Sequence, residues 1–197
     1  MKAIRLVLKG LIFFAAFMAA VWIFMPWKQV GEFALNIAEE ELGKRGMSLS
    51  YGSVEKAKSG FRVNNLTIDG LMKFSFDSFT FEPSAVESLL NTGPTAHISF
   101  RRGEVAAKPP LRLVPMAFGN GRAAAVVTPG EIVIEDLFTD GEFAISGVLT
   151  IDLTEMRIGR ADAPIRVADA IESNMQSFSL LLPLEQEGPG NWRLRRP

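Results

Sequence analysis

Side chains able to carry out chemistry are few and scattered in this sequence. The one histidine, His97 in "TAHISF", is out of phase with Ile98 and Phe100 and is expected on the wet face of a strand. A serine-histidine-aspartate site would need His97 as its base, but no nucleophile elbow accompanies it. The glycines of "FGNGRA" lack the Lys-Ser/Thr that follows in a phosphate-binding loop, so this stretch is interpreted as a hairpin turn.

Acidic residues gather in "EDLFTDGE", which contains Glu135, Asp136, Asp140 and Glu142. Their spacing misses the calcium-loop pattern, and two of them flank a turn. The absence of cysteine excludes disulfides, thiolate metal sites and cysteine nucleophiles, and a single histidine excludes a multi-histidine metal site. We therefore predict no catalytic residue, no metal site and no cofactor.

Charge is distributed unevenly over the 197 residues, whose formal net charge is −1. Lys2, Arg5 and Lys9 precede the first acidic residue, Glu32, and the remainder carries 18 basic against 22 acidic residues. This mildly acidic body lacks the electrostatic footprint of a nucleic-acid-binding protein, so nucleic acid is excluded as a partner.

The longest apolar stretch, "LVLKGLIFFAAFMAAVWIFMPW", lies near the N-terminus. A helix of about 20 apolar residues crosses a bilayer core, and tryptophan favours the membrane interface. Residues 1–27 are predicted to form a cytoplasmic tip and a membrane anchor, with the apolar side chains Leu11, Phe13, Phe14, Phe17, Val21, Trp22, Phe24 and Trp27. A cleaved signal peptide and a buried helix are the alternatives. The preceding positive charges predict a cytoplasmic N-terminus in the inner membrane of a Gram-negative bacterium, with the body in the periplasm.

Residues 28–46 are predicted to form an amphipathic connecting helix. Val30, Phe33, Ala34 and Ile37 recur at helical spacing and form its expected apolar face, with acidic residues on the other side. Gly43 or Gly46 can end the helix.

Residues 47–197 show the period of two that is typical of strands. Asp69-Gly70, Asn120-Gly121 and Asp140-Gly141 each lie between strand-like runs and predict hairpin turns. In "EFAISGVLTIDLT" apolar residues share one parity, which predicts one apolar and one wet face. The predicted fold is therefore mainly β: after the two N-terminal helices comes a curved antiparallel meander, either an open groove or a closed sandwich, with one or two short helices.

Two short helices are predicted within the meander. One follows Ser84, which forms a capping box with Glu87 and precedes the apolar residues Val86, Leu89 and Leu90. The second contains Val167, Ile171 and Met175 at intervals of four. Arg101-Arg102 is interpreted as a turn between strands, and "EQEGPGNWRLRRP" as a loosely held tail.

The stretch "FSFDSFTFEP" carries four phenylalanine rings, with a change of parity between Phe76 and Phe79. A bulge at Asp77-Ser78 would bend the strand and bring all four rings to the inner face of a curved sheet. The candidate apolar face then consists of Phe74, Phe76, Phe79, Phe81, Phe143, Ile145, Leu149 and Ile151. These side chains could form an ordinary core, contact phospholipid or another apolar ligand, or contact a protein partner.

The first half of the chain resembles a known family. The features are the step Met25-Pro26-Trp27, a helix ending at Leu42-Gly43, a strand from Leu49 to Val54, and the pattern from Gly60 to Ile68. This order resembles type II secretion system protein N and, more broadly, the AsmA-like proteins of Gram-negative envelopes.

The resemblance implies non-catalytic work in the envelope. For the N-type protein it implies association with other proteins of the secretion apparatus in the inner membrane. For the AsmA-like proteins it implies a curved sheet whose apolar concave face carries or shields lipid. We expect an assembly or support role in secretion, with lipid binding or transfer as the alternative.

Overall fold

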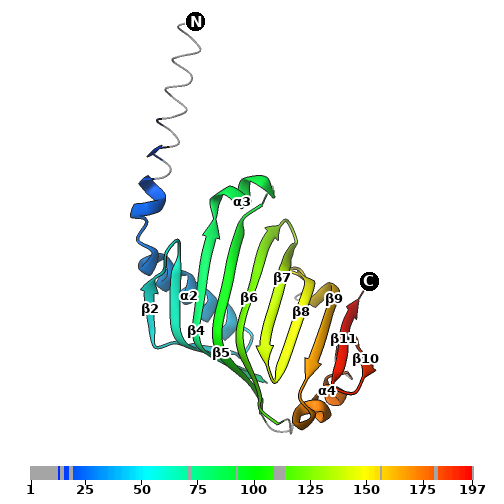
Figure 1. The fold of residues 1–197 in the computed structure, drawn as a ribbon. Helices are drawn as coiled ribbons and strands as arrows, with labels where there is room; N and C mark the ends of the chain where they lie inside the picture. The colour runs from blue at the N-terminus through cyan, green and yellow to red at the C-terminus, as the bar shows by residue number, and fades with distance from the viewer. Residues whose placement is uncertain are drawn as a thin grey trace, which may run out of the picture.

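The computed structural model describes residues 13, 16–17, 20–70, 72–91, 93–108, 114–155, 157–179 and 182–196. Within these residues the dominant element is an 11-stranded sheet, which Figure 1 shows as a curved layer. The strand order is β1-β3-β4-β5-β6-β7-β8-β9-β11-β10, with β2 also paired to β3. Neighbouring strands are antiparallel throughout, which confirms the predicted meander. The strand order runs from β1 at one edge to β10 at the other, so in the described residues the sheet is open and not a closed sandwich.

The strands follow one another closely along the chain. Their bounds are β1 (Ser48–Ser50), β2 (Ser53–Lys56), β3 (Phe61–Asp69), β4 (Met72–Ser84), β5 (Thr95–Ala107), β6 (Met116–Thr128), β7 (Glu131–Gly141), β8 (Phe143–Asp152), β9 (Arg157–Val167), β10 (Leu184–Gly188) and β11 (Asn191–Arg196). The helices are α2 (Trp27–Gly43), α3 (Ala85–Leu90), the single-turn η1 (Asp169–Ile171) and α4 (Glu172–Phe178).

In strands β3, β4 and β5, the alternation of side chains between the two faces of the sheet shifts by one residue at the same position. Asn65, Asp77 and Arg102 occupy this position, and the pairing is in register on both sides of it. Asn65 has φ 53° and Arg102 has φ 39°, both in the left-handed region, and Arg102 Nε lies 3.0 Å from Asp77 Oδ2. The expected bulge at Asp77-Ser78 is therefore wrong in form, because the three strands bend together and none gains a residue.

Further along the sheet, side chains supply hydrogen bonds where the pairing of strands shifts register or ends. The Asn120 N–H donates to Asp140 Oδ1 over 2.6 Å between β6 and β7. Between β7 and β8, Thr139 Oγ1 accepts from the Ile145 N–H (2.9 Å) and donates to the Phe143 carbonyl (3.2 Å). Because backbone polar groups in a sheet need partners, these side-chain hydrogen bonds let the strands bend while the N–H and carbonyl groups that they contact stay paired.

Two helices pack on the same face of the sheet, at opposite ends. Helix α2, behind the strands in Figure 1, packs against β1 to β3, and η1 with α4 packs against β9 and β11. We call this helix-bearing side the inner face. Two buried clusters result, and the strands between them carry half-buried apolar side chains on the inner face.

Three local expectations are wrong. Asn120-Gly121 lies inside β6, and Arg101-Arg102 with Gly103 lies inside β5, so neither forms a turn. The C-terminal stretch is not a loose tail, because β10 and β11 form a hairpin in which Trp192 and Leu194 are buried. The turns at Asp69-Gly70 and Asp140-Gly141 and the Ser84 N-cap are confirmed, but the Glu87 carboxylate contacts His97 instead of completing the capping box.

Helix α2 exists as predicted, but its buried face is a different one. Trp27, Gly31 and Leu35 face the sheet, whereas Phe33 is 67% exposed and Ile37 is 48% exposed. A Cβ atom at Gly31 would lie 2.7 Å from Phe61 Cγ, so the glycine permits the close approach. The hydrophobic pattern alone missed this face because glycine counts as neither apolar nor polar.

The predicted anchor lies largely outside the described residues, which include neither Leu11 nor Phe14. Among the described residues, no helix has both the length and the apolar character needed to cross a membrane. Phe13, Phe17, Val21 and Phe24 are exposed, whereas Trp27 is buried and packs edge-on against Trp22 at 5.0 Å between ring centroids.

Candidate apolar binding site

The inner face carries a group of phenylalanine rings that joins the two buried clusters. Phe76 lies 5.3 Å from Phe100 and 5.8 Å from Phe118, and Phe100 lies 5.5 Å from Phe118, measured between centroids. Phe79 extends the group toward α2 at 6.0 Å from Phe76. Such edge-to-face and tilted contacts are favoured geometries for aromatic pairs. The rings thus form a continuous apolar surface across β4, β5 and β6.

Two glycines make room for these rings. Gly103 lies directly across from Phe118, and a Cβ atom there would fall 1.8 Å from the Phe118 ring. Gly121 lies across from Phe100, and a Cβ atom there would fall 2.0 Å from that ring. The sequences "RRG" and "NG" resemble turns, but here their glycines serve packing. Each glycine lacks the side chain that would collide with a phenylalanine ring of the neighbouring strand.

At the α4 end of the inner face the surface becomes a cavity of about 340 Å³. Every described residue that lines it is apolar: Met72, Phe74, Val105, Met116, Phe118, Phe143, Ile145, Ile165, Met175, Phe178, Leu182, Leu184 and Leu194. The sheet supplies one wall, and α4 with the segment after it supplies the other. Its volume falls within the range of small-molecule sites, which usually add a few polar groups that orient the ligand.

The wall formed by α4 is held by apolar and polar contacts. Ile171 and Met175, which are each 1% exposed, lie in η1 and α4, whereas Val167, expected in the same helix, is the last residue of β9. Asn174, 2% exposed, uses its side-chain amide to accept from the Val114 N–H (3.1 Å) and donate to the Val114 carbonyl (2.6 Å). The helix is thereby tied to the segment that leads into β6.

The structure brings together only part of the candidate apolar face at this cavity. Phe74, Phe143 and Ile145 line it, and Leu149 packs against the same cluster. Phe76, Phe79 and Phe81 pack instead against the cluster under α2, and Ile151 is half-buried opposite Ile132 and Ile158. Sequence reasoning missed Met116, Phe118, Phe178 and Leu194. The alternation of Trp192 and Leu194 is a signal from which the buried strand could have been predicted.

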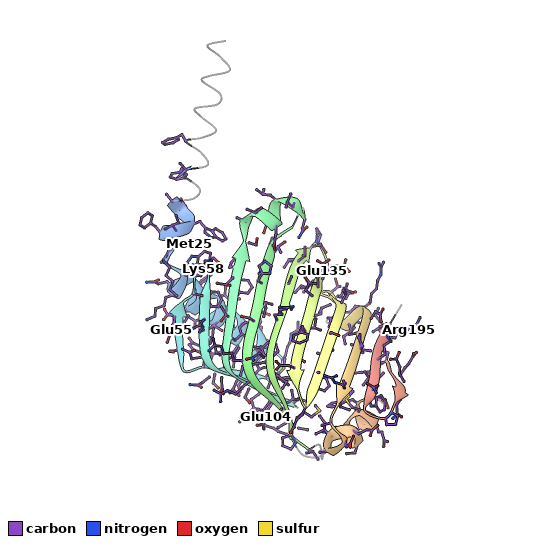
Figure 2. All side chains as sticks on the ribbon, viewed as in Figure 1. Met25, Glu55, Lys58, Glu104, Glu135 and Arg195 are labelled. Atoms are coloured by element: carbon purple, nitrogen blue, oxygen red, sulfur yellow. The ribbon has the colours of Figure 1, made fainter. Side chains whose placement is uncertain are left out.

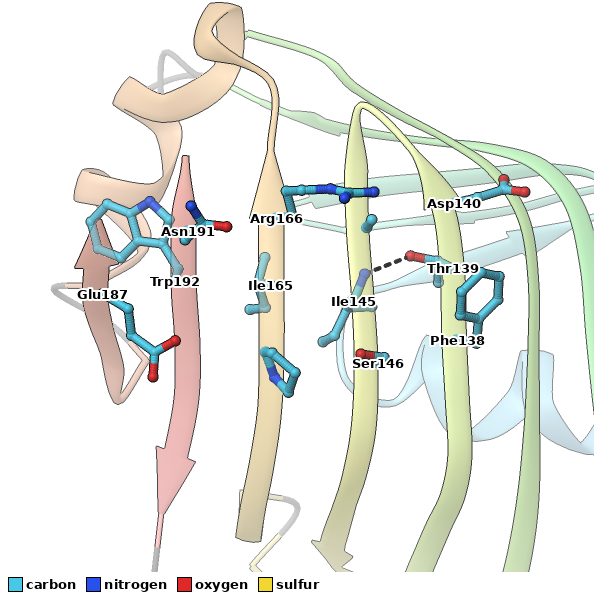
Figure 3. Close-up of a pocket in the computed structure, with 12 residues that line it drawn as sticks. Phe138, Thr139, Asp140, Ile145, Ser146, Ile165, Arg166, Glu187, Asn191 and Trp192 are labelled. Atoms are coloured by element: carbon cyan, nitrogen blue, oxygen red, sulfur yellow. Dashed lines mark hydrogen bonds between the residues drawn. The ribbon is translucent and has the colours of Figure 1, made fainter. Parts of the chain in front are cut away.

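A second depression, of about 360 Å³, lies over β7, β8, β9, β11 and β10 (Figure 3). It mixes apolar side chains with Asp140, Arg166 and Glu187. Asp140 and Thr139 are already engaged in the sheet hydrogen bonds described above, which include the Thr139–Ile145 bond drawn in Figure 3. The polar atoms of Asp140 and Thr139 therefore serve the strand pairing.

The residues singled out for chemistry do not assemble into a reactive site. His97 Nε2 lies 2.8 Å from Glu87 Oε2, and both side chains are largely solvent-accessible. Across the described ranges, no group of three or more histidine and acidic side chains is placed to hold a metal ion. What the described residues do form is an apolar surface that continues into an apolar cavity.

Comparison with known proteins yields one family. No curated protein matches the chain, and no solved structure matches it. A family model described as type II secretion system protein GspN-like, Synergistales, matches residues 4–196. The match supports a role related to type II secretion and covers nearly the whole chain, so this protein belongs to the GspN-like family of type II secretion system proteins.

Proposed function

We propose that the chain is a non-catalytic component of the type II secretion apparatus, anchored in the inner membrane with its sheet in the periplasm. Family membership over residues 4–196 is the observation that carries this proposal. The apolar stretch before α2, preceded by Lys2, Arg5 and Lys9, supports the anchor and a cytoplasmic N-terminus. Its partners are other proteins of the apparatus, which it helps to assemble or support.

Removal of the gene from its native bacterium tests this role. Proteins normally released by type II secretion should accumulate inside the envelope, and the intact gene should restore their release. Chemical crosslinking in native membranes, followed by purification of the full-length chain, should recover subunits of the apparatus. Normal release together with the absence of apparatus subunits from the crosslinked material would contradict the proposal.

A second function, binding of a lipid acyl chain, is favoured by the apolar cavity under α4. Filling it would remove apolar surface from water, at about 25 cal/mol per Å² of surface buried. The ring surface of Phe76, Phe100 and Phe118 adjoins this cavity, since Phe118 belongs to both. An apolar region of this kind is a recognised mark of a ligand or partner site. The head group would remain outside, near solvent.

Photo-crosslinking distinguishes a ligand site from ordinary core. A photoreactive phenylalanine analogue replaces Phe118 in the cavity and, as control, Phe138, which is 45% exposed beside Arg122. Each full-length variant is irradiated in its native membrane and analysed by mass. Phospholipid adducts at Phe118 and not at Phe138 support acyl-chain binding. Adducts confined to the chain itself at Phe118 mean that the cavity is ordinary core.

A further inference from the structure

Helix α3 presents apolar side chains to solvent at the tip between β4 and β5. Val86 is 70% exposed, Leu89 is 84% exposed and Leu90 is 76% exposed. Among the described residues that follow α2, these are the most exposed large apolar side chains. The sequence predicted a common apolar face for these three residues, and the structure turns that face outward.

The outward orientation of α3 is fixed by polar contacts on its other side. Ser84 Oγ accepts from the Glu87 N–H (3.4 Å), and Ser88 Oγ donates to the Ser84 carbonyl (2.6 Å). The Thr95 N–H donates to Ser88 Oγ over 2.8 Å, and the Glu87 carboxylate contacts His97. Polar residues thus face the protein and apolar residues face away, which is the reverse of a helix that packs on its own sheet.

The tip lies beside the end of the N-terminal apolar segment. A cavity of about 520 Å³ lies between the two. Trp22 and Ile23 line one side of it, and residues 82–86 and His97 are among those that line the other. In Figure 1 the start of the described chain and α3 lie at the same end of the sheet. Figure 2 shows Met25 and Lys58 toward this end and Glu104 toward the opposite one. The apolar surfaces of α3 and of Phe24, 82% exposed, are therefore exposed at one end of the molecule.

We propose that α3 inserts Val86, Leu89 and Leu90 into the interfacial layer of the phospholipid bilayer that holds the N-terminal segment. This inference rests on the proposed membrane anchor. A short amphipathic element with an apolar face favours this depth of a membrane. Between residues 83 and 96 the one charged residue is Glu87, whose carboxylate lies 2.8 Å from His97 Nε2, so the apolar face of α3 itself carries no charge. Two contact points, the anchor and α3, would hold the sheet with this end on the bilayer.

The absence of cysteine from the chain makes site-specific labelling direct. Leu89→Cys, in the full-length protein, is labelled with an environment-sensitive fluorophore and reconstituted into phosphatidylethanolamine and phosphatidylglycerol vesicles. Leu90→Cys provides a second probe of the same face. Val148→Cys, in β8 and 46% exposed, is the control on the sheet, and Phe24→Cys reports on the N-terminal segment.

The labels at Leu89 and Leu90 should show blue-shifted emission, quenching by spin-labelled lipid and protection from aqueous iodide, all relative to Val148. If the label at Phe24 is quenched by lipid while both α3 labels match Val148, the α3 proposal is overturned and the anchor stands. If the Phe24 label also matches Val148, the anchor itself fails. Blue-shifted emission and iodide protection of the α3 labels in vesicles, without quenching by spin-labelled lipid, would mean that a protein surface covers α3, which also overturns the proposal.

Discussion

Asn174 and Val114, 60 residues apart, are joined by a pair of hydrogen bonds that uses both halves of the Asn174 amide. The side-chain oxygen accepts from the Val114 N–H at 3.1 Å, and the side-chain nitrogen donates to the Val114 carbonyl at 2.6 Å. The pair imitates one rung of a strand ladder while linking a helix to a loop. It holds α4 over the apolar cavity, and it does so with a buried side chain that has little freedom to find other partners.

Replacing Asn174 with alanine should destabilise the protein. The change leaves the backbone N–H and carbonyl of Val114 without their partner. Because Val114 is 48% exposed and water can replace part of this bonding, we expect a loss of about 1 kcal/mol. The measurement is the free energy of unfolding in urea, with the full-length chain in detergent. Asn191→Ala is the matched control, because its side chain is exposed and donates only to the nearby Pro189 carbonyl. Equal losses in the two variants would show that the Val114 contact contributes nothing.

Gly103→Ala should disturb the ring surface of the inner face. The added methyl group would fall within 1.8 Å of the Phe118 ring, and overpacking of this kind costs about 1–3 kcal/mol. Gly188→Ala is the control, because a Cβ atom there meets no neighbour within 4 Å. Combining Gly103→Ala with Phe118→Leu should recover part of the loss, seen as a positive coupling in a double-mutant cycle. Simple additivity of the two changes would refute the assigned contact.

Gly31→Ala should have two opposing effects on the free energy of unfolding. Alanine is the better helix former by about 1 kcal/mol. Its methyl group, however, would lie 2.7 Å from Phe61 Cγ and 2.9 Å from Val54 Cγ1, inside a packed cluster where an overpacking cost of about 1–3 kcal/mol is usual. We expect the clash to prevail and the variant to unfold at a lower urea concentration than the parent. Gly43→Ala, with no neighbour within 4 Å, should be neutral or slightly stabilising.

Asp152 should make the turn after β8 sensitive to acid. Its Oδ1 accepts from the Thr154 N–H at 2.8 Å and from the Glu155 N–H at 3.0 Å, and mainly these two bonds, that from Glu155 first, lower the pKa of the carboxyl from its ordinary value of 3.8. A lowered pKa means that the stabilisation is present above about pH 3.8 and is lost as the pH falls through the folded-state pKa.

The variant Asp152→Asn tests this linkage, since an amide oxygen does not titrate. The parent should have the higher unfolding midpoint at neutral pH, and the difference should shrink as the pH falls below the ordinary carboxyl value. A difference that is constant with pH would mean that the carboxylate charge at this turn is immaterial.

Local sequence patterns were sufficient for several elements of the fold. The turns at Asp69-Gly70 and Asp140-Gly141 follow from the dipeptides themselves, and the start of α3 follows from Ser84 and Glu87. The spacing of Ile171 and Met175 likewise predicted a short helix, and η1 and α4 are found there. Each of these features depends on residues close together in the chain, so the sequence alone carries the information.

What only the tertiary structure decided concerns residues that meet across strands. Gly103 and Gly121 resembled turn residues, yet their role is to admit Phe118 and Phe100 from the neighbouring strand. The apolar cavity forms because α4 and the hairpin of β10 and β11 return to the sheet, and the segment with Leu194 was interpreted as a tail. The sequence by itself determined a curved antiparallel meander, and it did not distinguish an open groove from a closed sandwich. The choice of an open sheet with helices at both ends depends on long-range packing, which no local pattern encodes.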